Sequence, residues 1–260
     1  WNKLEEKAAD LGWPESEIEA EKQRIAIKNL RGIDKDSFLS KVAKAYLAIL
    51  GDGRGGIHCE NSLESFHNWS AKTFEDIQPE SFDVIVTNPP FGKKLSIDST
   101  EILELYDLGH RWNSVPGGVF EKGALADKQP PQLLFIERCF QMLRPGGRMG
   151  IVLLERIFGM PKYQYVVNYI RLQAKINAIV TLPEDLFQPH THAKCCVLIC
   201  QKYKKNESYS SCDNYDIFMS DVKWCGHDSR GNITYSYTST GEKVVLDEIP
   251  LVADRYLEMR

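Results

Sequence analysis

The chain has 260 residues, enough for one large α/β domain or for a domain with an appendage. Hydrophobic residues make up 43% and charged residues 26% of the chain, as in an ordinary soluble globular protein, and no apolar run reaches the ~20 residues of a membrane span. The net charge of −4 argues against a protein that binds nucleic acid over a broad basic surface, so such binding needs a local patch or a partner subunit.

The front of the chain predicts helices and short strands in alternation. Apolar spacing and turn residues predict helices over residues 1–11 and 15–28, a strand over 30–34, a helix over 37–49 and a strand over 57–60. The glycine-rich run at 51–56 follows a helix and not a strand, so we interpret it as a helix stop and turn.

The most informative segment is Phe82–Gly92, where an apolar, β-branched run leads into Asn88-Pro89-Pro90-Phe91. Two prolines cannot donate to a sheet and therefore end the strand in a stiff loop. That loop lies at the carboxyl end of a strand, where open α/β sheets bind their ligands. The Asn88 side chain and the Pro89 carbonyl offer two fixed acceptors for an exocyclic amine, and Phe91 offers a ring that stacks on a planar group.

The rest of the chain continues the alternation. We expect a long polar loop over residues 93–129, helices over 133–143 and 163–172, strands over 148–154, 175–182 and 194–201, and a further strand over 215–219. Strands that alternate with helices predict a mostly parallel sheet covered on both faces, with an antiparallel end near 175–201. The expected organisation is a helical lead-in (1–29), a catalytic core (30–202) and a carboxyl-terminal extension (203–260).

No metal site is expected. The seven cysteines form no Cys-x-x-Cys pair and several lie in strand-like runs, which indicates reduced, buried thiols in a cytoplasmic protein. His190-Thr191-His192 has the look of a metal pair, but loop histidines without acidic or cysteine partners are mostly not ligands.

From about residue 28 to about residue 250 the chain resembles the modification subunits of type I restriction-modification systems, which are N6-adenine DNA methyltransferases, or a close type II relative. The resemblance rests on the order and spacing of several runs: Leu30–Asp36, Asn61–Leu63, Asn88–Gly92, Leu143–Arg148, Leu182–Phe187, and Phe218–Val222 with Gly226–Asp228. It implies a Rossmann-like, S-adenosylmethionine-dependent methyltransferase fold. It also implies DNA as substrate, partnership with a specificity subunit and a restriction subunit, and no membrane.

The resemblance assigns roles to individual residues. Asn88, Pro89, Pro90 and Phe91 form the catalytic motif, and Asn88 also belongs to the cofactor-binding set. Asp34 accepts hydrogen bonds from the ribose hydroxyls of the cofactor, unless it only caps the next helix as Asp36 is expected to do. Three further residues complete the expected cofactor site: Ile33, which packs on the cofactor adenine or belongs to the core, Asn61, which accepts from the adenine amine, and Ser62, which lies beside it or caps the following segment.

One departure from the family is expected to matter. The family's first strand ends in a glycine loop that cradles the methionine end of the cofactor, and no such loop follows a strand in this sequence. We therefore expect a sheet that lacks its usual first strand, between the strands that end at Asp34 and at Asn88, and an amino-terminally truncated fragment with weak cofactor binding and no turnover.

Two alternatives to an adenine-specific DNA methyltransferase remain open. An RNA base or protein-glutamine methyltransferase shares the Asn-Pro-Pro-aromatic motif. A non-catalytic scaffold that keeps the methyltransferase fold only to hold a specificity subunit on DNA would explain the missing glycine loop.

Overall fold

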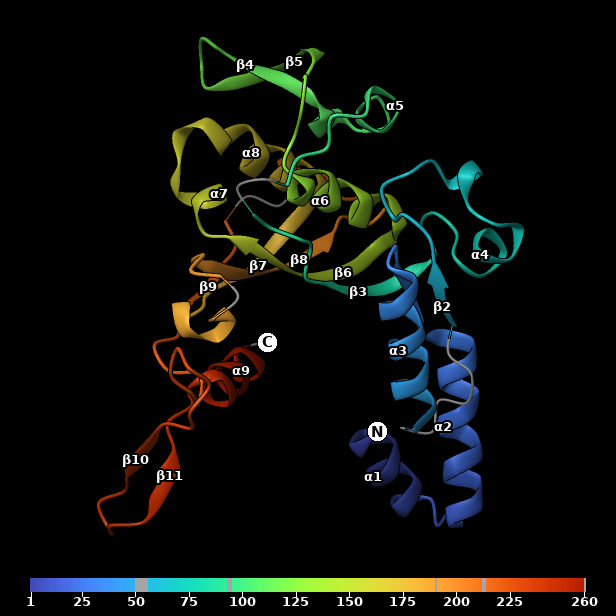
Figure 1. Ribbon diagram of the computed structural model, residues 1–260, viewed down its shortest axis with the longest axis vertical. Coiled ribbons are helices and arrows are strands. Elements are labelled where there is room, and N and C mark those ends of the chain that lie inside the picture. Colours follow the sequence, from blue (N-terminus) through green and yellow to red (C-terminus); the bar gives the residue numbers. More distant parts are fainter. Residues whose placement is uncertain (50–55, 93–94, 190, 212–213, 260) are drawn as a thin grey trace. The chain divides into compact units, whose positions relative to one another are not determined.

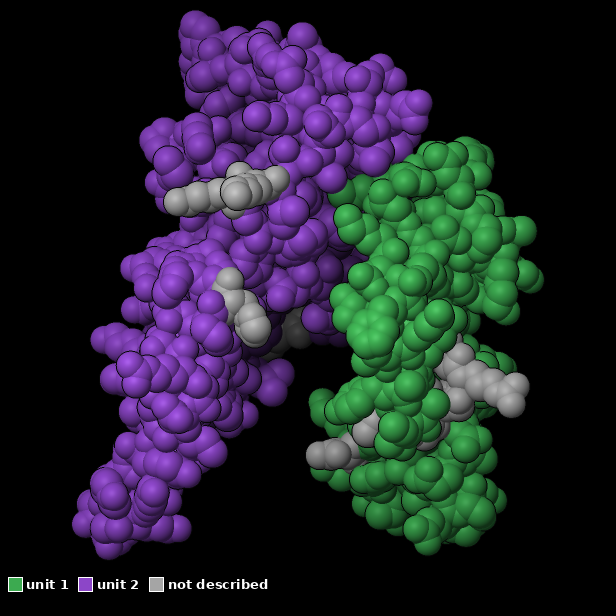
Figure 2. All heavy atoms as spheres, in the orientation of Figure 1, with its two compact units in different colours: residues 1–78 green, residues 79–260 purple. Residues whose placement is uncertain are grey.

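The computed structural model describes residues 1–49, 56–92, 95–189, 191–211 and 214–259 (Figure 1). The chain divides into two compact units, residues 1–78 and residues 79–260, which are coloured separately in Figure 2. The three domains expected from the sequence, with boundaries at 29/30 and 202/203, stay predictions. In the described part of the chain no helix is long and apolar enough to cross a membrane.

Unit 1 is built of helices around a two-stranded parallel sheet. Its elements are α1 (Asn2–Asp10), α2 (Glu15–Asn29), β1 (Arg31–Asp34), α3 (Ser37–Ile49), β2 (Gly56–Cys59), the 3₁₀ turn η1 (Phe66–Asn68) and α4 (Ala71–Asp76). β1 and β2 run parallel, with Asp34 opposite Cys59. This β–α–β arrangement confirms the helices and strands predicted for the front of the chain.

Polar contacts join the elements of unit 1. The Arg31 guanidinium donates to the carbonyls of Ile27 and Leu30, both at 2.8 Å, and so fastens the end of α2 to β1. The imidazole of His58 on β2, which is 8% exposed, lies 3.0 Å from Thr73 Oγ1 and 3.2 Å from Asp76 Oδ2, both on α4. Burial lowers the pKa of this imidazole, although the Asp76 carboxylate opposes the shift.

Unit 2 is organised around a five-stranded mixed sheet in the order β3-β6-β8-β7-β9. Its strands are β3 (Phe82–Thr87), β6 (Leu143–Leu154), β7 (Ala174–Thr181), β8 (Cys195–Lys202) and β9 (Phe218–Asp221). β3 and β6 are parallel, as are β7 and β9, whereas β8 is antiparallel to both of its neighbours. The expected α/β fold with an antiparallel section near residues 175–201 is confirmed. The prediction of a mostly parallel sheet was wrong for this unit, because β8 pairs antiparallel with both of its neighbours and makes the sheet mixed.

The core of unit 2 lies on one face of this sheet. Helices α6 (Pro131–Met142) and α8 (Gln164–Gln173) lie over the same face (Figure 1) and bury Ile136 and Ile170 against it. The remaining elements of unit 2 are α5 (Thr100–Leu103), η2 (Asp107–Gly109), β4 (His110–Val115), β5 (Val119–Leu125), α7 (Arg156–Gly159), η3 (Pro161–Tyr163), η4 (Glu184–Phe187), η5 (Tyr209–Ser211), β10 (Tyr235–Tyr237), β11 (Lys243–Val245) and α9 (Ile249–Glu258).

β3 is an edge strand of the five-stranded sheet, hydrogen-bonded on one side to β6. Its side chains alternate: Ile85 packs against the core, while Val84 and Val86 on the opposite face are 49% and 82% exposed. Exposed valines on a strand whose outer edge is unpaired are unusual, because native sheets normally cover or protect such an edge. In unit 1, α3 also exposes apolar side chains, among them Phe38 and Ile49.

The sequence predicted a long polar loop over 93–129, and that prediction was incomplete. The segment contains the short helix α5 and the antiparallel hairpin of β4 and β5. Gly117 and Gly118 form its turn with φ of +91° and +75°, which favours glycine. Buried Glu137 on α6 fixes the base of the hairpin, because its carboxylate accepts from the backbone N–H groups of Asp107 and Leu108 at 2.9 and 2.8 Å.

Candidate functional site

The Asn88–Phe91 loop begins where β3 ends, one residue after the Thr87–Ile151 pair with β6. Pro89 is buried, whereas Asn88 is exposed and Phe91 is half-buried. The buried proline anchors the loop, and the asparagine amide is left open to a ligand. The loop lines a cavity of about 370 Å³ together with Leu186, Phe187, Gln188 and Thr191. This volume falls in the range of small-molecule pockets.

Phe187 forms an aromatic pair with Phe91 of the loop. Its ring meets the ring of Phe91 edge to face, with centroids 5.6 Å apart and an interplanar angle of 83°. It ends η4, a turn that follows β7, and its carbonyl accepts from the Thr191 N–H at 3.1 Å. Sequence reasoning used Phe187 only as part of a family run and gave it no role. The available signal was an aromatic residue in a loop at the end of a sheet strand.

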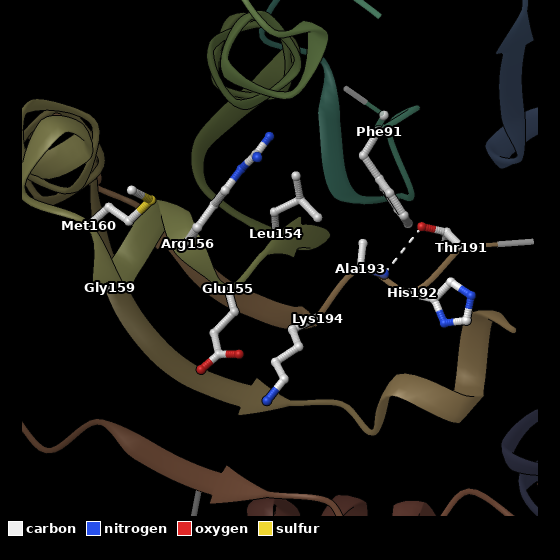
Figure 3. A pocket seen from close by; sticks show the side chains of 11 residues that line it. Phe91, Leu154, Glu155, Arg156, Gly159, Met160, Thr191, His192, Ala193 and Lys194 are labelled. Carbon is white, nitrogen blue, oxygen red and sulfur yellow. Dashed lines mark hydrogen bonds between the residues drawn. The ribbon is translucent and has the colours of Figure 1, made fainter. Parts of the chain in front are cut away.

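A larger cavity of about 680 Å³ also has Phe91 in its lining (Figure 3). It lies at the end of β6 and is lined by Phe91, Gly92, Leu154, Glu155, Arg156, Gly159, Met160, Thr191, His192, Ala193 and Lys194. Leu154 is buried and stands opposite Cys195 in the sheet. Glu155, Arg156 and Lys194 are exposed. The cavity therefore has apolar walls and charged groups that solvent reaches.

The residues expected to bind cofactor lie in unit 1, at the carboxyl ends of β1 and β2. Because these strands are parallel, Asp34 and Asn61 share one edge of their sheet, and the Glu60 N–H donates to the Asp34 carbonyl at 3.2 Å. Asp34 Oδ1 accepts from the Asp36 N–H at 2.8 Å. Asp36 itself caps α3 by accepting from the N–H groups of Phe38 and Leu39, as expected.

The amide of Asn61 is largely committed to its own turn. Its Oδ1 accepts from the Leu63 N–H at 3.1 Å, and its Nδ2 donates to Glu64 Oε1 at 3.0 Å. Ile33 and Ser62 are half-buried. The expected site residues thus form two separate sets, each within one unit. Ile33, Asp34, Asn61 and Ser62 belong to unit 1, and Asn88–Phe91 belong to unit 2.

Two sequence interpretations fall wholly or partly outside the described residues. The glycine-rich turn at 51–56 is described only at Gly56, where β2 begins. His190 of the histidine pair also lies outside. Within the described ranges, no group of three or more His, Cys, Asp or Glu side chains is arranged to hold a metal ion.

Comparison with known proteins gives the geometry a family context. Residues 14–232 match the family described as N-6 DNA Methylase. The chain is also 25% identical, over 189 residues, to the methylase subunit of the type I restriction enzyme EcoEI from Escherichia coli. That alignment covers 65% of this chain and 34% of the subunit, so the chain spans about a third of the length of this curated relative.

Two solved structures share the fold. The methyltransferase subunit of a type I restriction-modification system from Streptococcus thermophilus superposes with a TM-score of 0.55 at 18% identity, over 89% of this chain and 42% of that one. A class I S-adenosylmethionine-dependent methyltransferase, described as putative, from Listeria monocytogenes superposes with a TM-score of 0.51 at 19% identity, over 74% and 49%. At these identities the likeness establishes the fold: an α/β methyltransferase with a mixed sheet.

Proposed function

The chain belongs to the N-6 DNA methylase family, and from that premise we propose that it carries the catalytic loop of an adenine-specific DNA methyltransferase. The reaction is transfer of a methyl group from S-adenosylmethionine to the N6 amine of an adenine in DNA. One observation carries the proposal: Asn88-Pro89-Pro90-Phe91 follows strand β3 and lines a cavity together with Phe187, whose ring packs edge to face on Phe91.

The loop supplies acceptors for the amine. An adenine inside a duplex offers no reachable amine, so the base is flipped out of the stack. The Asn88 side-chain carbonyl and the Pro89 backbone carbonyl accept hydrogen bonds from the N6 amine, which favours tetrahedral nitrogen with an available lone pair. Phe91 stacks on the ring and replaces part of the stacking lost from the duplex, worth about 1–3 kcal/mol. Alignment then supplies most of the catalysis, without a metal.

The residues in unit 1 fit part of the cofactor. S-adenosylmethionine, when bound, supplies an electrophilic methyl group. Asp34 has carboxylate lone pairs beyond the one given to Asp36, so it can also accept from ribose hydroxyls. Ile33 packs on the adenine ring, Asn61 accepts from its amine with the remaining lone pair of Oδ1, and Ser62 lies beside it. Asn88, in unit 2, belongs to the same expected cofactor set.

The sheet of unit 2 supports an additional strand beside β3. The free edge of β3 and the exposed Val84 and Val86 are what a strand and a covering element would bury. The glycine loop for the methionine end of the cofactor belongs on that strand. We propose that the 260 residues without it bind S-adenosylmethionine weakly and do not turn over.

The partners follow from the relatives. The curated relative is the methylase subunit of a type I restriction enzyme, and one solved structure with the same fold concerns complex assembly of a type I system. We propose that this protein likewise works with a specificity subunit and a restriction subunit. In such a complex the specificity subunit recognises the target DNA sequence.

A non-catalytic scaffold is the second candidate. It is favoured by the commitment of the Asn61 amide to its own turn. Such a protein would bind DNA with its partners but would not need Asn88.

A methylation assay separates these functions. Radiolabelled S-adenosylmethionine is supplied to the protein, extended to the length of its relatives and combined with its partner subunits, with DNA, RNA or protein as acceptor. N6-methyladenine in DNA, formed much more slowly by Asn88→Ala, supports the proposal. Label in RNA or protein alone, or no label despite DNA binding, contradicts it.

A further inference from the structure

Arg156 is a cation beside the catalytic loop that has no partner in the described part of the chain. It follows β6 and Glu155, lines the larger cavity with Phe91, and is exposed. No hydrogen bond or ion pair to its guanidinium occurs among the described residues. Lys194, on the same cavity, differs in that its ammonium lies 3.4 Å from Glu184.

The backbone around Arg156 is held in place. The Glu155 N–H donates to the Lys194 carbonyl at 3.0 Å, which ties the start of α7 to the loop before β8. The Arg156 carbonyl accepts from the Met160 N–H at 3.0 Å, and Ile157 is buried in the core. The backbone that carries the Arg156 side chain is therefore held in place by its neighbours.

The direction of the side chain matters as well. Arg156 and Glu155 project to different sides of the chain, so the neighbouring carboxylate does not neutralise the guanidinium (Figure 3). β3 and β6 are adjacent parallel strands, so Asn88 and Arg156 both follow the same edge of the sheet. Leu154 and Met160 line the cavity with apolar surface, which leaves the guanidinium as a charged group able to grip an anion there.

We propose that Arg156 binds a phosphate of the DNA strand next to the nucleotide whose base reaches Asn88 and Phe91. This inference rests on the proposed function and adds a substrate contact to it. A guanidinium binds phosphate oxygens with two parallel hydrogen bonds, and phosphate contacts fix the register of a protein on DNA. The contact therefore serves to position the extruded nucleotide. The methionine carboxylate of the methyl donor carries similar oxygens and is the competing ligand.

The salt dependence of DNA binding tests the contact. Affinity for a duplex oligonucleotide is measured by fluorescence anisotropy at several salt concentrations, with the protein extended to the length of its relatives and combined with its partner subunits. Losing one phosphate contact lowers the slope of log affinity against log salt by about 0.9. For Arg156→Ala this corresponds to a loss of about eightfold at 0.1 M salt and about twofold at 0.5 M. Arg156→Lys, which keeps the charge, should recover most of the slope.

Arg148→Ala is the matched control. Arg148 is also exposed and lies on β6, the strand that precedes Arg156, six residues before Leu154 and about 20 Å from the end of the strand. Its loss changes the net charge equally but should leave the slope unchanged. An unchanged slope for Arg156→Ala, or equal changes for Arg148→Ala and Arg156→Ala, overturns the inference.

Two further readouts separate this inference from the proposed function. Arg156→Ala should raise KM for DNA and leave KM for S-adenosylmethionine unchanged; a rise confined to the methyl donor would assign Arg156 to its carboxylate and overturn the phosphate contact. Asn88→Ala should lose methylation and keep the salt slope. If the wild-type protein methylates DNA while Arg156→Ala behaves as wild type, this inference fails alone. If the wild type does not bind DNA, both fail.

Discussion

Phe187 meets Phe91 edge to face, with ring centroids 5.6 Å apart, although the two residues are 96 positions apart in the sequence (187 − 91). One ring ends the loop after β3 and the other ends the turn after β7, so loops that follow two different strands meet at one cavity. An edge-to-face pair leaves the face of one ring available for a planar ligand. This relationship gives the catalytic loop a second wall.

We predict that Phe187→Ala weakens DNA methylation at the level of the target base. Stacking on an aromatic side chain is worth about 1–3 kcal/mol per base, which converts to a loss of about 5- to 150-fold in kcat/KM for DNA. Binding of S-adenosylmethionine, measured by calorimetry, should stay unchanged. Phe218→Ala is the control, because Phe218 forms a similar edge pair with Tyr256 at 5.5 Å. Equal losses in both variants would show a general folding defect.

A second prediction concerns Asn88. Asn88→Ala removes one of the two acceptors for the amine and should lower kcat by about 10²–10³-fold, by analogy with the loss of one hydrogen-bonding group that serves the transition state. Because Asn88 is exposed, the melting temperature should stay within the range of ordinary surface substitutions. Asn88→Asp keeps an acceptor and should retain more activity than Asn88→Ala. Turnover of Asn88→Ala comparable to the wild type would refute the assignment.

The sequence predicted the parts of the fold that local patterns control. The strand before Asn88, helices α1 to α3 of unit 1 and the change to antiparallel pairing near residues 175–201 all follow from apolar spacing and from proline and glycine. Helix α4 of unit 1 was not predicted. Asp36 was predicted as a helix cap for the same reason: its bonds to Phe38 and Leu39 span only two or three residues.

Distant contacts explain what the sequence did not reveal. The β4–β5 hairpin shows only weak alternation of apolar and polar residues. It is held by two contacts to other elements: Glu137 accepts from the backbone at its base, and Tyr165 stacks on Trp112 of β4 with ring centroids 6.0 Å apart. Neither partner is near the hairpin in sequence. Phe187 was missed for the same reason, because only the folded sheet brings it to Phe91. Local sequence rules do not describe such contacts.

The exposed face of β3 gives a third prediction, which tests the proposed additional strand. Val86 is 82% exposed, so Val86→Lys should change the free energy of unfolding of the 260 residues by less than about 0.5 kcal/mol. In a longer form that contains the strand, the same substitution buries an unpaired charge and should cost at least about 2 kcal/mol. Urea denaturation of both forms measures the difference.

Ile85→Lys is the control for this comparison. Ile85 packs against the core on the opposite face of β3, so its substitution should destabilise both forms. Equal, small effects of Val86→Lys in both forms would mean that nothing covers this face, and the proposed strand would have to be placed elsewhere.

The fourth prediction concerns pH and unit 1. Burial holds the pKa of the His58 imidazole below its usual value of 6.5, so the unfolded chain binds a proton more tightly than the folded one. Stability is therefore fully present above pH 6.5 and falls as the pH drops through 6.5 towards the lower folded pKa. Glu60, whose pKa is lowered chiefly by the Ser70 N–H, contributes its own loss only below about pH 4.5. The window between pH 7.5 and 5.5 therefore leaves out the loss from Glu60. Burial raises the pKa of Glu137 above its usual value, so the contribution of His58 is obtained as the difference between the wild type and a His58 variant.

Urea denaturation followed by tryptophan fluorescence in that window, with Trp69 buried in unit 1, compares the wild type with His58→Gln. The variant loses the contact with Thr73 and should be less stable at pH 7.5, but its stability should change less as the pH falls. The Asp76 carboxylate acts against burial, because it lies 3.2 Å from His58 Nε2 and favours the protonated ring. A wild type that becomes more stable towards pH 5.5 would show that this ion pair outweighs burial, and the predicted direction would be wrong.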